Sequence, residues 1–453
     1  MLTKSDFLLF LEAPMHLWAS KHIKSFKPYV SEYDRHLMEQ GKEVEKLARN
    51  FLPGAEWQRT YKSGEFETRA DALIKNDDDT YDLYEVKSTT NVEKEHLYDA
   101  TFQSIVIGKN IKLNKIYIVT LNKDYILEDS LNINALFKKN DVTEKVKDLI
   151  SETESKMNEA LHVINLDSSK YIENCLKPDK CPCLDLCHPN LPGKSIFNIP
   201  LLNSKKAREL LDSKIFEIKD IPLSFELSAK QKLIANVIRS GLPHLNKEGL
   251  KKFLDTLIYP LHFLDYETYP LAVPVYKGYK PYQHMVFQYS LHIVGDDKNI
   301  EHKEHLEIEN CDPSVSLLAK LKDDIGSVGS VIVWNKTFEF ERNKDMAGLY
   351  PEHKDFLDDV NSRMIDLADF INKEHYIHPD FLGSWSIKHV LPVMVPELSY
   401  KDLKVNKGDL AMLAWWELIH TSDKSKAKDL LEYCCLDTMA MVKIWEKLNL
   451  LTV

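Results

Sequence analysis

The chain has 453 residues, of which 44% are hydrophobic and 28% are charged, and its formal net charge is −11. These values exclude a disordered chain and a generally basic nucleic-acid coat, and the length predicts two domains. No run of about 18 apolar residues is present, so we expect no membrane span. The start of the chain, Met1–Asp6, lacks the charged and then apolar order of a signal peptide, which favours a cytoplasmic protein.

The first 121 residues alternate helical and strand patterns. Apolar spacing predicts a helix over residues 3–24, which Pro14 should kink or split, and a second helix over 32–51. Strands are expected over 56–61, 65–74 and 81–88, followed by a helix over 93–107 and a strand over 115–121. This order of elements predicts an α/β domain.

Two acids and a lysine lie on neighbouring strands of this region. Asp71 lies near the end of one strand, and Glu85 and Lys87 point to the same face of its hairpin partner, because side chains alternate along a strand. Two carboxylates can bind a divalent metal, and a lysine can hold a phosphate or polarise a water molecule. An ordinary cross-strand salt bridge is the alternative interpretation.

These three residues, with Gln103 on the following helix, resemble the RecB-like nucleases of the PD-(D/E)XK superfamily, including the CRISPR-associated branch with a cysteine cluster. The resemblance implies a restriction-endonuclease-like domain and a catalytic centre made of Asp71, Glu85, Lys87 and Gln103. In that family an upstream histidine also ligates the metal. Glu45 stands in its place here, so the expected ligands of Mg²⁺ or Mn²⁺ are Glu45, Asp71 and Glu85.

Four cysteines fall within thirteen residues after a charged helix expected over 142–164. They are Cys175, Cys181, Cys183 and Cys187, and His188 follows the last one. In a reducing compartment this clustering predicts metal binding rather than disulfides. The resemblance implies an iron–sulfur cluster whose fourth cysteine comes from the first helix, but Ala13-Pro14 stands there. Cys183 or His188 is the expected substitute, and either an iron–sulfur cluster or Zn²⁺ suits the four thiols.

A second acidic motif follows a predicted connector over residues 191–255, which contains a helix over 229–240. Asp265 and Glu267 lie two residues apart at the end of the apolar strand that begins at Leu261, so their side chains point to the same side. Two adjacent carboxylates repel each other unless a countercharge is present, and a hard divalent cation supplies one.

Two later motifs carry matching chemistry. Glu339 follows the apolar strand over 330–334, at the end of the stretch Asn335–Glu339, after a helix over 313–325. Tyr433 and Asp437 are four residues apart in a closing helix over 426–448, so they share one face of it. Asp366, after a further short strand, is expected to cap a helix rather than to bind a metal.

This order of motifs resembles the RNase H-like 3′–5′ exonucleases of the group with four acids and a tyrosine (DEDD). The resemblance implies that Asp265, Glu267, Glu339 and Asp437 hold two Mg²⁺ or Mn²⁺ ions and that Tyr433 orients the attacking water. The family usually has aspartate where this chain has Glu339.

The whole chain resembles an uncharacterised bacterial family that fuses these two nuclease domains. We therefore expect an α/β protein with a RecB-like domain over 1–190, a connector over 191–255 and an RNase H-like domain over 256–453. The expected activity is metal-dependent phosphodiester hydrolysis, with a 3′–5′ exonuclease centre in the second domain and a further centre in the first. The alternative is a nucleic-acid-binding or scaffold protein with a degenerate first domain.

The basic residues indicate how a nucleic acid would be bound. Only eight of the 59 basic residues are arginine. Because bidentate reading of guanine favours arginine, we expect DNA or RNA to be bound through phosphates without sequence specificity. The sequence does not decide between DNA and RNA or indicate an oligomeric state.

Overall fold

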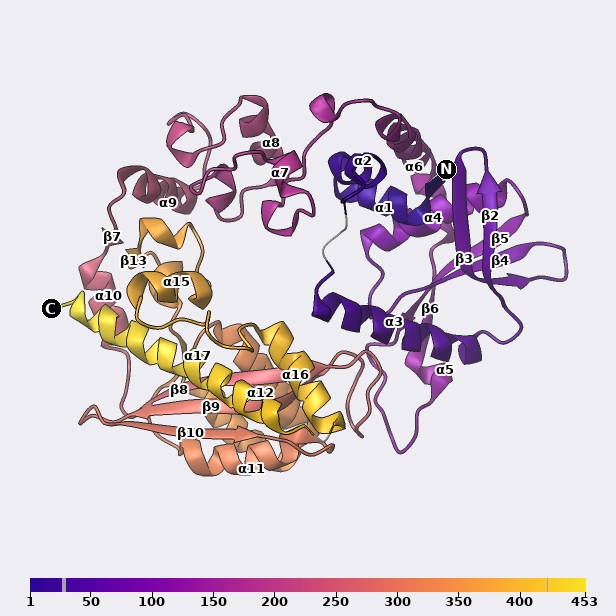
Figure 1. Cartoon of the computed structure of the whole chain (residues 1–453). Coiled ribbons are helices and arrows are strands. Elements are labelled where there is room, and N and C mark those ends of the chain that lie inside the picture. Colours follow the sequence, from indigo (N-terminus) through magenta and orange to yellow (C-terminus); the bar gives the residue numbers. More distant parts are fainter. Residues whose placement is uncertain (27–29, 422) are drawn as a thin grey trace. The chain divides into compact units, whose positions relative to one another are not determined.

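The computed structural model describes residues 1–26, 30–421 and 423–453 and contains two compact units of mixed α/β structure (Figure 1). The first unit consists of Met1–Asn190 together with the segment Leu271–Tyr282. The second consists of Leu191–Pro270 and Gln283–Val453. The predicted connector therefore lies in the second unit, and one segment of the expected second domain lies in the first.

A mixed sheet forms the centre of the first unit, in the order β1-β3-β4-β5-β6, with β2 paired to β3. β4 and β5 run parallel, and β3 runs antiparallel to β2 and β4. Lys87 lies just beyond the end of β4, although the sequence predicted it inside the strand. The strands are β1 (Leu2–Thr3), β2 (Glu56–Ser63), β3 (Phe66–Lys75), β4 (Tyr81–Val86), β5 (Leu113–Leu121) and β6 (Phe137–Asp141).

The helices of the first unit begin with the predicted split at Pro14. Thr3 caps the first of them, because its hydroxyl accepts from the N–H of Asp6 while the Asp6 carboxylate accepts from the N–H of Thr3. Ala13 is extended, and Pro14 opens the next helix at the position where its missing N–H is harmless. The helices are α1 (Lys4–Glu12), α2 (Pro14–His22), α3 (Glu32–Phe51), α4 (Lys94–Gly108), α5 (Ile133–Leu136), α6 (Thr143–Ile164) and α7 (Leu184–Cys187).

Side-chain alternation gives this sheet two covered faces. Leu83 packs in the core that contains α4 and α6, whereas its neighbour Tyr84 packs in the core that contains α3. The segment Leu271–Tyr282 adds to the second core, where Ala272 is buried. Its Tyr282 hydroxyl hydrogen-bonds to Ser88, directly after Lys87 in the chain.

The second unit is built on a mixed sheet of order β10-β9-β8-β11-β12. β8, β9 and β10 are antiparallel, whereas β8, β11 and β12 are parallel. The strands are β8 (Leu261–Pro270), β9 (His284–Val294), β10 (Ile300–Leu306), β11 (Val331–Val333) and β12 (Met364–Asp366).

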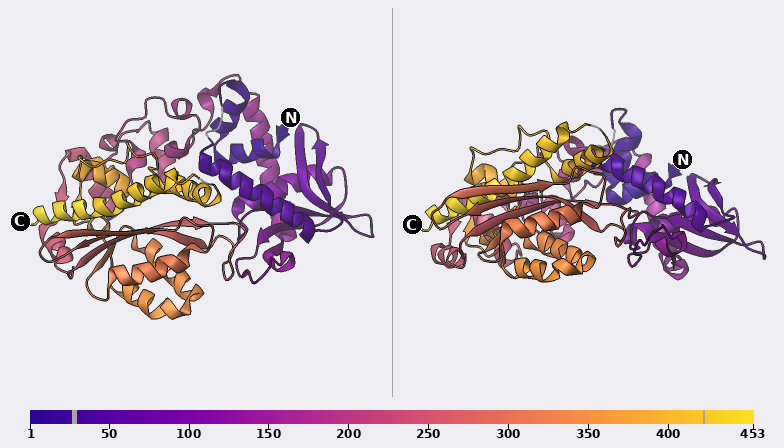
Figure 2. Two further views of the ribbon diagram at one scale, coloured as in Figure 1. Left: turned by 60° about the horizontal axis from the view of Figure 1, so that its bottom comes forward. Right: turned by 90° about the horizontal axis from the view of Figure 1, so that it is seen from below.

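Helices cover both faces of this sheet (Figure 2). On β8, Phe263 packs in the core that contains α17, and Leu264 packs in the opposite core with α11 and α13. Because Asp265 and Glu267 share the parity of Phe263, they face α17. These helices are α11 (Pro313–Ile325), α12 (Lys336–Leu349), α13 (Lys354–Ser362), α14 (Asp369–Asn372), α15 (Ile387–Met394), α16 (Gly408–His420) and α17 (Ser425–Leu450).

The connector region adds helices and a small strand pair to the second unit. The predicted helix over 229–240 is present as α9, which a Ser228–Gln231 capping box begins and the left-handed Gly241 ends. The region contains α8 (Ser204–Asp212), α9 (Ala229–Ser240), α10 (Lys247–Leu254) and β7 (His244–Leu245), which pairs with β13 (Tyr376–Ile377). Short 3₁₀ helices lie at Ser169–Tyr171, Pro178–Lys180, Ile196–Asn198, Ile218–Asp220, Pro351–His353 and Pro379–Phe381.

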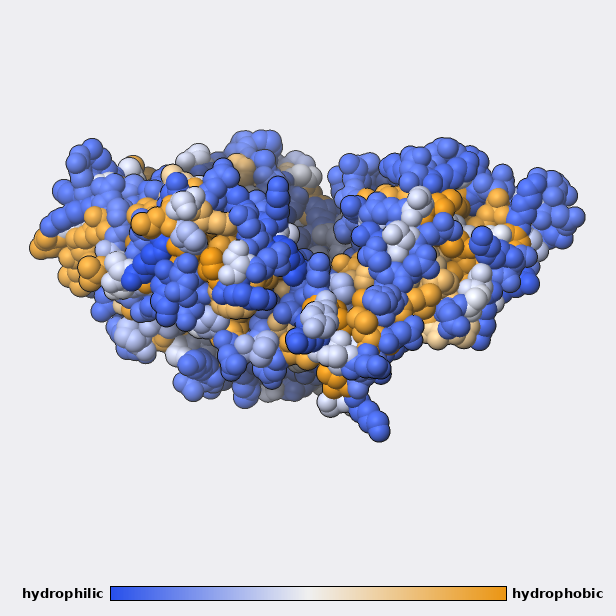
Figure 3. Space-filling model, turned by 90° about the horizontal axis from the view of Figure 1, so that it is seen from above, coloured by the Kyte–Doolittle hydropathy of each residue, from blue (hydrophilic) through white to orange (hydrophobic). Residues whose placement is uncertain are grey.

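Polar residues prevail on the face of the molecule seen in Figure 3, with apolar residues scattered among them. Within the described residues, no helix has the length and apolar character needed to cross a bilayer.

Candidate metal centres

Acids from β8 and α17 form the main cluster of the second unit. Glu267 and Asp437 are buried, at 7% and 8% exposure, whereas Asp265 is partly exposed. Burial, and then the charges of the neighbouring acids, raise the pKa of Asp265 and Glu267 well above the usual range. The structure thus brings together the acids of the strand motif and the helix motif.

Two tyrosines hold Asp437. The Tyr400 hydroxyl donates to Oδ1 of Asp437 at 2.5 Å, and Tyr433, one turn earlier on α17, also hydrogen-bonds to this carboxylate. Burial nevertheless raises the pKa of Asp437 to about 6. Burial also raises the pKa of Tyr400 and Tyr433, so both remain neutral donors at neutral pH.

Glu339 lies in the first turn of α12 and is 2% exposed. Its Oε2 atom is buried and has no hydrogen-bond partner among the described residues. Burial and the charge of Asp265 raise the pKa of Glu339 well above its usual range. Since a buried carboxylate oxygen without a partner is unfavourable, Glu339 suits a role as ligand of a cation.

Asp366 was expected to cap the helix that follows it, but α14 has no side-chain cap and Asp366 accepts at the start of the earlier helix α12 instead. Its carboxylate accepts the backbone N–H of Asn335 and Lys336 at the start of α12, at 3.1 and 3.0 Å. It also accepts from the N–H of Ala368, which precedes α14. Asn335 itself is left-handed, with φ of +72°, and makes the sharp turn between β11 and α12.

Lys388 is a functional candidate that the sequence reasoning missed. It lies on α15, and its charge opposes the raised pKa of Asp265, Glu267 and Asp437. Its Nζ lies 5.8 and 5.6 Å from the ring centroids of Tyr400 and Tyr433 and donates to the carbonyl of Asn406 at 3.2 Å.

The thiol of Cys434 also reaches this cluster, because its Sγ lies 3.6 Å from Oδ2 of Asp265. Cys434 follows Tyr433 on α17, so it lies within the helix motif that the sequence predicted to be part of the site. Lys388 and Tyr400 come from segments without an acidic motif, and no spacing signal places them at the cluster.

The oxygen donors of this centre suit Mg²⁺ or Mn²⁺. The ligand atoms of Asp265, Glu267 and Cys434 lie within 4.8 Å of one another. The charges of Lys388, and of Arg342 near Glu339, do not bring the acids back to their ordinary pKa. The cluster therefore lacks positive charge, a deficit that bound divalent cations would offset.

The acids of the first unit are arranged differently. Glu85 and Gln103 are buried, and the Gln103 amide donates to Oε2 of Glu85 at 2.6 Å. Oε1 of Glu85 accepts from Lys87 at 2.9 Å and from Lys4 of α1 at 2.8 Å. The structure thus brings Glu85, Lys87 and Gln103 together, and it adds Lys4, which the sequence analysis did not single out.

Asp99 on α4 completes this network. It is 1% exposed, pairs with Lys87 and Lys4, and accepts from Gln103 at 2.9 Å. Two lysines thus offset the charges of Glu85 and Asp99. The remaining acid, Asp71, accepts from the N–H of Val86, and burial followed by the charge of Glu85 raises its pKa to about 8. The network is close to electrically balanced without a metal ion.

Glu45 was expected to ligate a metal together with Asp71 and Glu85, but in the structure it bonds to other residues. Its Oε1 accepts from Arg49 and from Gln58, both at 3.0 Å. The buried residues of α3 pack in the core with Tyr84, whereas Glu85 points to the opposite face of β4. The arrangement therefore does not bring Glu45 to Glu85 as a common metal ligand.

The cysteine cluster gains a histidine from α2. One ligand atom from each of His16, Cys181, Cys183 and Cys187 lies within 4.8 Å of the others. Nε2 of His16 is 3.5 Å from Sγ of Cys181, and the Sγ atoms of Cys183 and Cys187 are 3.7 Å apart. This group could hold a metal ion.

His16 lies two residues after Pro14, close to the place where the resemblance implies a cysteine, although the sequence analysis named Cys183 or His188 as substitute. Cys183 does lie in the group. Nε2 of His188 instead contacts Cys175, 2.8 Å from its carbonyl oxygen and 3.8 Å from its Sγ.

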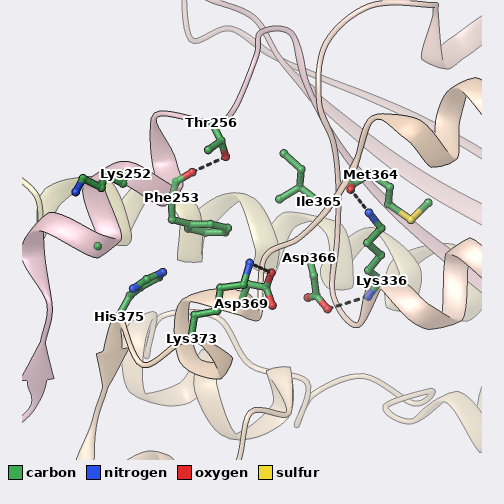
Figure 4. Close-up of a pocket in the computed structure, with 11 residues that line it drawn as sticks. Lys252, Phe253, Thr256, Lys336, Met364, Ile365, Asp366, Asp369, Lys373 and His375 are labelled. Atoms are coloured by element: carbon green, nitrogen blue, oxygen red, sulfur yellow. Dashed lines mark hydrogen bonds and ion pairs between the residues drawn. The ribbon is translucent and has the colours of Figure 1, made fainter.

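A separate pocket of about 480 Å³ lies at the β12 edge of the second unit (Figure 4). Lys252 and His375 lie on one side of it and Lys336 and Asp366 on the other. Its lysines already have partners: Lys336 donates to the carbonyl of Met364 at 2.6 Å, and Lys373 pairs with Asp369 at 2.8 Å. None of the four clustered acids is among its described lining residues, so we place no reaction there.

Comparisons with known proteins match parts of this chain. The family described as "Domain of unknown function (DUF2779)" matches residues 262–386, which include Asp265, Glu267 and Glu339. "Uncharacterized protein UU173" of Ureaplasma parvum serovar 3 (strain ATCC 700970) is 30% identical over 144 residues, 25% of this chain and 20% of that protein. The chain thus spans about a fifth of that relative's length. The matches support an uncharacterised domain family.

A solved structure titled "Crystal structure of SSO0001" covers 40% of this chain and 85% of its own, at 16% identity and a TM-score of 0.21. A likeness at that score carries no argument about the fold.

Proposed function

We propose that the second unit is a metal-dependent nuclease that removes nucleotides from 3′ ends by phosphodiester hydrolysis. The observation that carries this proposal is the convergence of four acids, Asp265, Glu267, Glu339 and Asp437, whose pKa values remain raised despite nearby cations. Buried acids without sufficient countercharge are unfavourable unless they serve a cation.

The sheet of the second unit supports the RNase H-like part of this proposal. Its antiparallel strands β8–β10 and its parallel strands β8, β11 and β12 form the mixed sheet that the resemblance implies. The acids extend from the first strand, the helix after β11 and the closing helix, which is the chain order of the exonuclease motifs.

Each residue of the centre then has a chemical role. Asp265, Glu267, Glu339 and Asp437 would hold two divalent cations, which when bound supply charge that activates water and stabilises the leaving oxygen. Tyr433 would orient the attacking water through its neutral hydroxyl. Lys388 would face the scissile phosphate and offset its negative charge. DNA or RNA is the proposed substrate, bound without sequence specificity.

For the first unit we propose nucleic-acid binding and, in second place, a nuclease centre at Asp71, Glu85, Lys87 and Gln103. The balanced network favours binding, because Lys4 and Lys87 already donate to Oε1 of Glu85 and Gln103 donates to Oε2, the two oxygens that a metal would need. A cavity of about 410 Å³ in this unit is lined by Lys123, Lys138 and Lys145, which suit contacts to phosphates.

For the cysteine–histidine group we propose a single ion of the zinc class rather than an iron–sulfur cluster. Two ligands about 2.0–2.3 Å from one tetrahedral zinc ion lie about 3.3–3.8 Å apart. The separations of 3.5 and 3.7 Å within the group agree with this geometry. In a four-iron cluster each cysteine binds a different iron, which holds the sulfur atoms further apart.

An assay on four substrates tests the nuclease activity. Purified full-length protein is incubated with end-labelled single- and double-stranded DNA and RNA, in Mn²⁺, in Mg²⁺ or in EDTA. We expect stepwise shortening from the 3′ end of at least one substrate with Mn²⁺ or Mg²⁺ and none with EDTA. Intact substrates under all conditions would contradict the proposal.

A further inference from the structure

A second group of metal-ligand side chains lies in the second unit, on the same face of the sheet as the carboxylates. It contains His292 of β9, His302 of β10 and Cys435 of α17, and one ligand atom of each lies within 4.8 Å of the other two. His292 and His302 are direct partners in the β9–β10 ladder, and their rings stack with centroids 4.3 Å apart. The β9–β10 hairpin and the distant helix α17 thus converge at this point.

Hydroxyl groups hold one nitrogen of each ring. Nε2 of His302 lies 2.9 Å from Oγ of Ser290, and Nδ1 of His292 lies 2.8 Å from Oγ1 of Thr438. These two hydroxyl oxygens are themselves 2.7 Å apart. Histidines that ligate metals characteristically bond through their second nitrogen to such an outer partner, which fixes the tautomer and the ring orientation.

The other nitrogens are available for a ligand. Nδ1 of His302 faces Cys435, with 4.0 Å between it and Sγ, a separation slightly longer than that of two ligands on one ion. Within the described residues His292 hydrogen-bonds through Nδ1, which leaves Nε2 for a ligand. Because His302 and Cys435 are both partly exposed, small side-chain rotations can close the gap.

We propose that His292, His302 and Cys435 bind one transition-metal ion of the zinc class. Two imidazoles and a thiolate suit Zn²⁺, whereas Mg²⁺ binds oxygen ligands. This site therefore differs in chemistry from the four acids beside it. Three protein ligands at a partly exposed position leave the fourth for water.

The ion would have a structural consequence for the neighbouring centre. Cys435 belongs to α17, which also carries Tyr433 and Asp437, whereas the histidines belong to β9 and β10. A metal bond between them fixes α17 to the antiparallel half of the sheet. The proposal does not depend on nuclease activity, because metal binding is measured directly.

Metal titration of the full-length protein tests the site. Zn²⁺ binding is counted against a chromophoric chelator for the wild type and for Cys435→Ser, and Co²⁺ spectra are recorded for both. We expect one fewer tightly bound equivalent in the variant and a weaker thiolate–Co²⁺ absorption band. Cys435→Asp, which restores an anionic ligand, should regain the equivalent without regaining the band.

Two further variants make the result decisive. Cys311→Ser removes an exposed cysteine of the same unit and should bind as the wild type does. His302→Gln changes a partly exposed ligand and should also lose one equivalent, so it decides the matter if Cys435→Ser does not fold. Equal Zn²⁺ equivalents in the wild type, Cys435→Ser and His302→Gln would overturn the proposal and leave a metal-free polar network under α17.

Discussion

At the scale of single residues, unequal charge balance separates the two acidic centres. In the second unit, Asp265 and Glu267 retain a strongly raised pKa although Lys388 is near them. In the first unit, Lys4 and Lys87 bond directly to Glu85, and its pKa is lowered because their charges outweigh the effect of burial. Metal-dependent chemistry is therefore expected first at the centre without direct lysine partners.

Lys388 offers a direct test at this scale. Lys388→Met should slow phosphodiester cleavage on the order of 10²–10³-fold in single-turnover assays, the typical effect of losing one preorganised charged group. The pH dependence of the cleavage rate of Lys388→Met should also shift to higher pH, because the acids lose a nearby positive charge that lowers their pKa. Lys388→Arg should retain part of the rate, and Lys401→Met, an exposed lysine of the same unit, should change nothing. Unaltered cleavage by Lys388→Met would remove this residue from the centre.

The raised carboxylate pKa values predict a pH dependence of metal binding. The pKa of Asp437 is about 6 in the folded chain against about 3.9 for a free aspartate, so between these values the folded state binds a proton that the unfolded state lacks. This contribution stabilises the metal-free protein below about pH 4 and is lost as the pH rises through about 6. Because a cation competes with that proton, Mn²⁺ affinity should rise from pH 5 to pH 8.

Calorimetric titration of Mn²⁺ at pH 5, 6, 7 and 8 measures this effect. Asp437→Asn should bind Mn²⁺ more weakly at every pH, with Asp402→Asn, an exposed position of the same unit, as control. A wild-type affinity that does not change with pH would show that the acids are already ionised in the metal-free chain.

At the scale of elements, the sequence predicted most helices and strands well, because their signals are local. Pro14 divided the first helix as expected, and the helices α3, α9 and α11 have nearly the predicted bounds. The acids of β8 and α17 could be predicted to lie together because the order of the motifs resembles that of a known family. No motif predicted the positions of His16 and Lys388, because these depend on how α2 and α15 pack. The position of Glu45 was set by Arg49 and Gln58 rather than by a motif.

The short helix α2 is expected to supply a metal ligand to the cysteine group. His16→Ala should lower the metal content of purified protein and allow faster alkylation of Cys181, whose Sγ lies 3.5 Å from the ring. His22→Ala, in the last turn of the same helix, is the matched control because the ring of His22 stacks on Trp18 instead. Elemental analysis for zinc, iron and sulfide checks the prediction, and equal iron and sulfide in the wild type and His16→Ala would favour a cysteine-ligated cluster.

At the scale of the whole molecule, the division into units could be predicted only in part. The first stretch of the chain ends its unit at Asn190, close to the expected boundary, but Leu271–Tyr282 also packs in that unit. This segment joins β8 to β9, and its apolar residues Ala272 and Val273 fill the core beneath α3. The sequence of a loop does not predict which core it packs in, because that depends on contacts with residues far away in the chain.

A double substitution separates the activities of the two units. If the first unit only binds nucleic acid, Asp265→Asn should abolish all cleavage, and Lys87→Ala should weaken substrate binding by a modest factor. If the first unit also cleaves, Asp265→Asn should leave a metal-dependent activity that the added Lys87→Ala removes. Because the network around Glu85 is balanced without metal, we expect the first result. Residual cleavage that disappears only in the double variant would establish a second centre.

Cleavage of a 5′-labelled single strand in Mn²⁺ tests the nuclease activity of the second unit most directly. The wild type, Asp265→Asn and the exposed-site control Asp402→Asn are prepared and assayed identically. Removing one carboxylate from the cluster should abolish the ladder of products shortened from the 3′ end, whereas the control should produce that ladder at the wild-type rate. If Asp265→Asn, folded as judged by its thermal unfolding, produced the same ladder at the same rate as the wild type, the four acids would not form a nuclease centre.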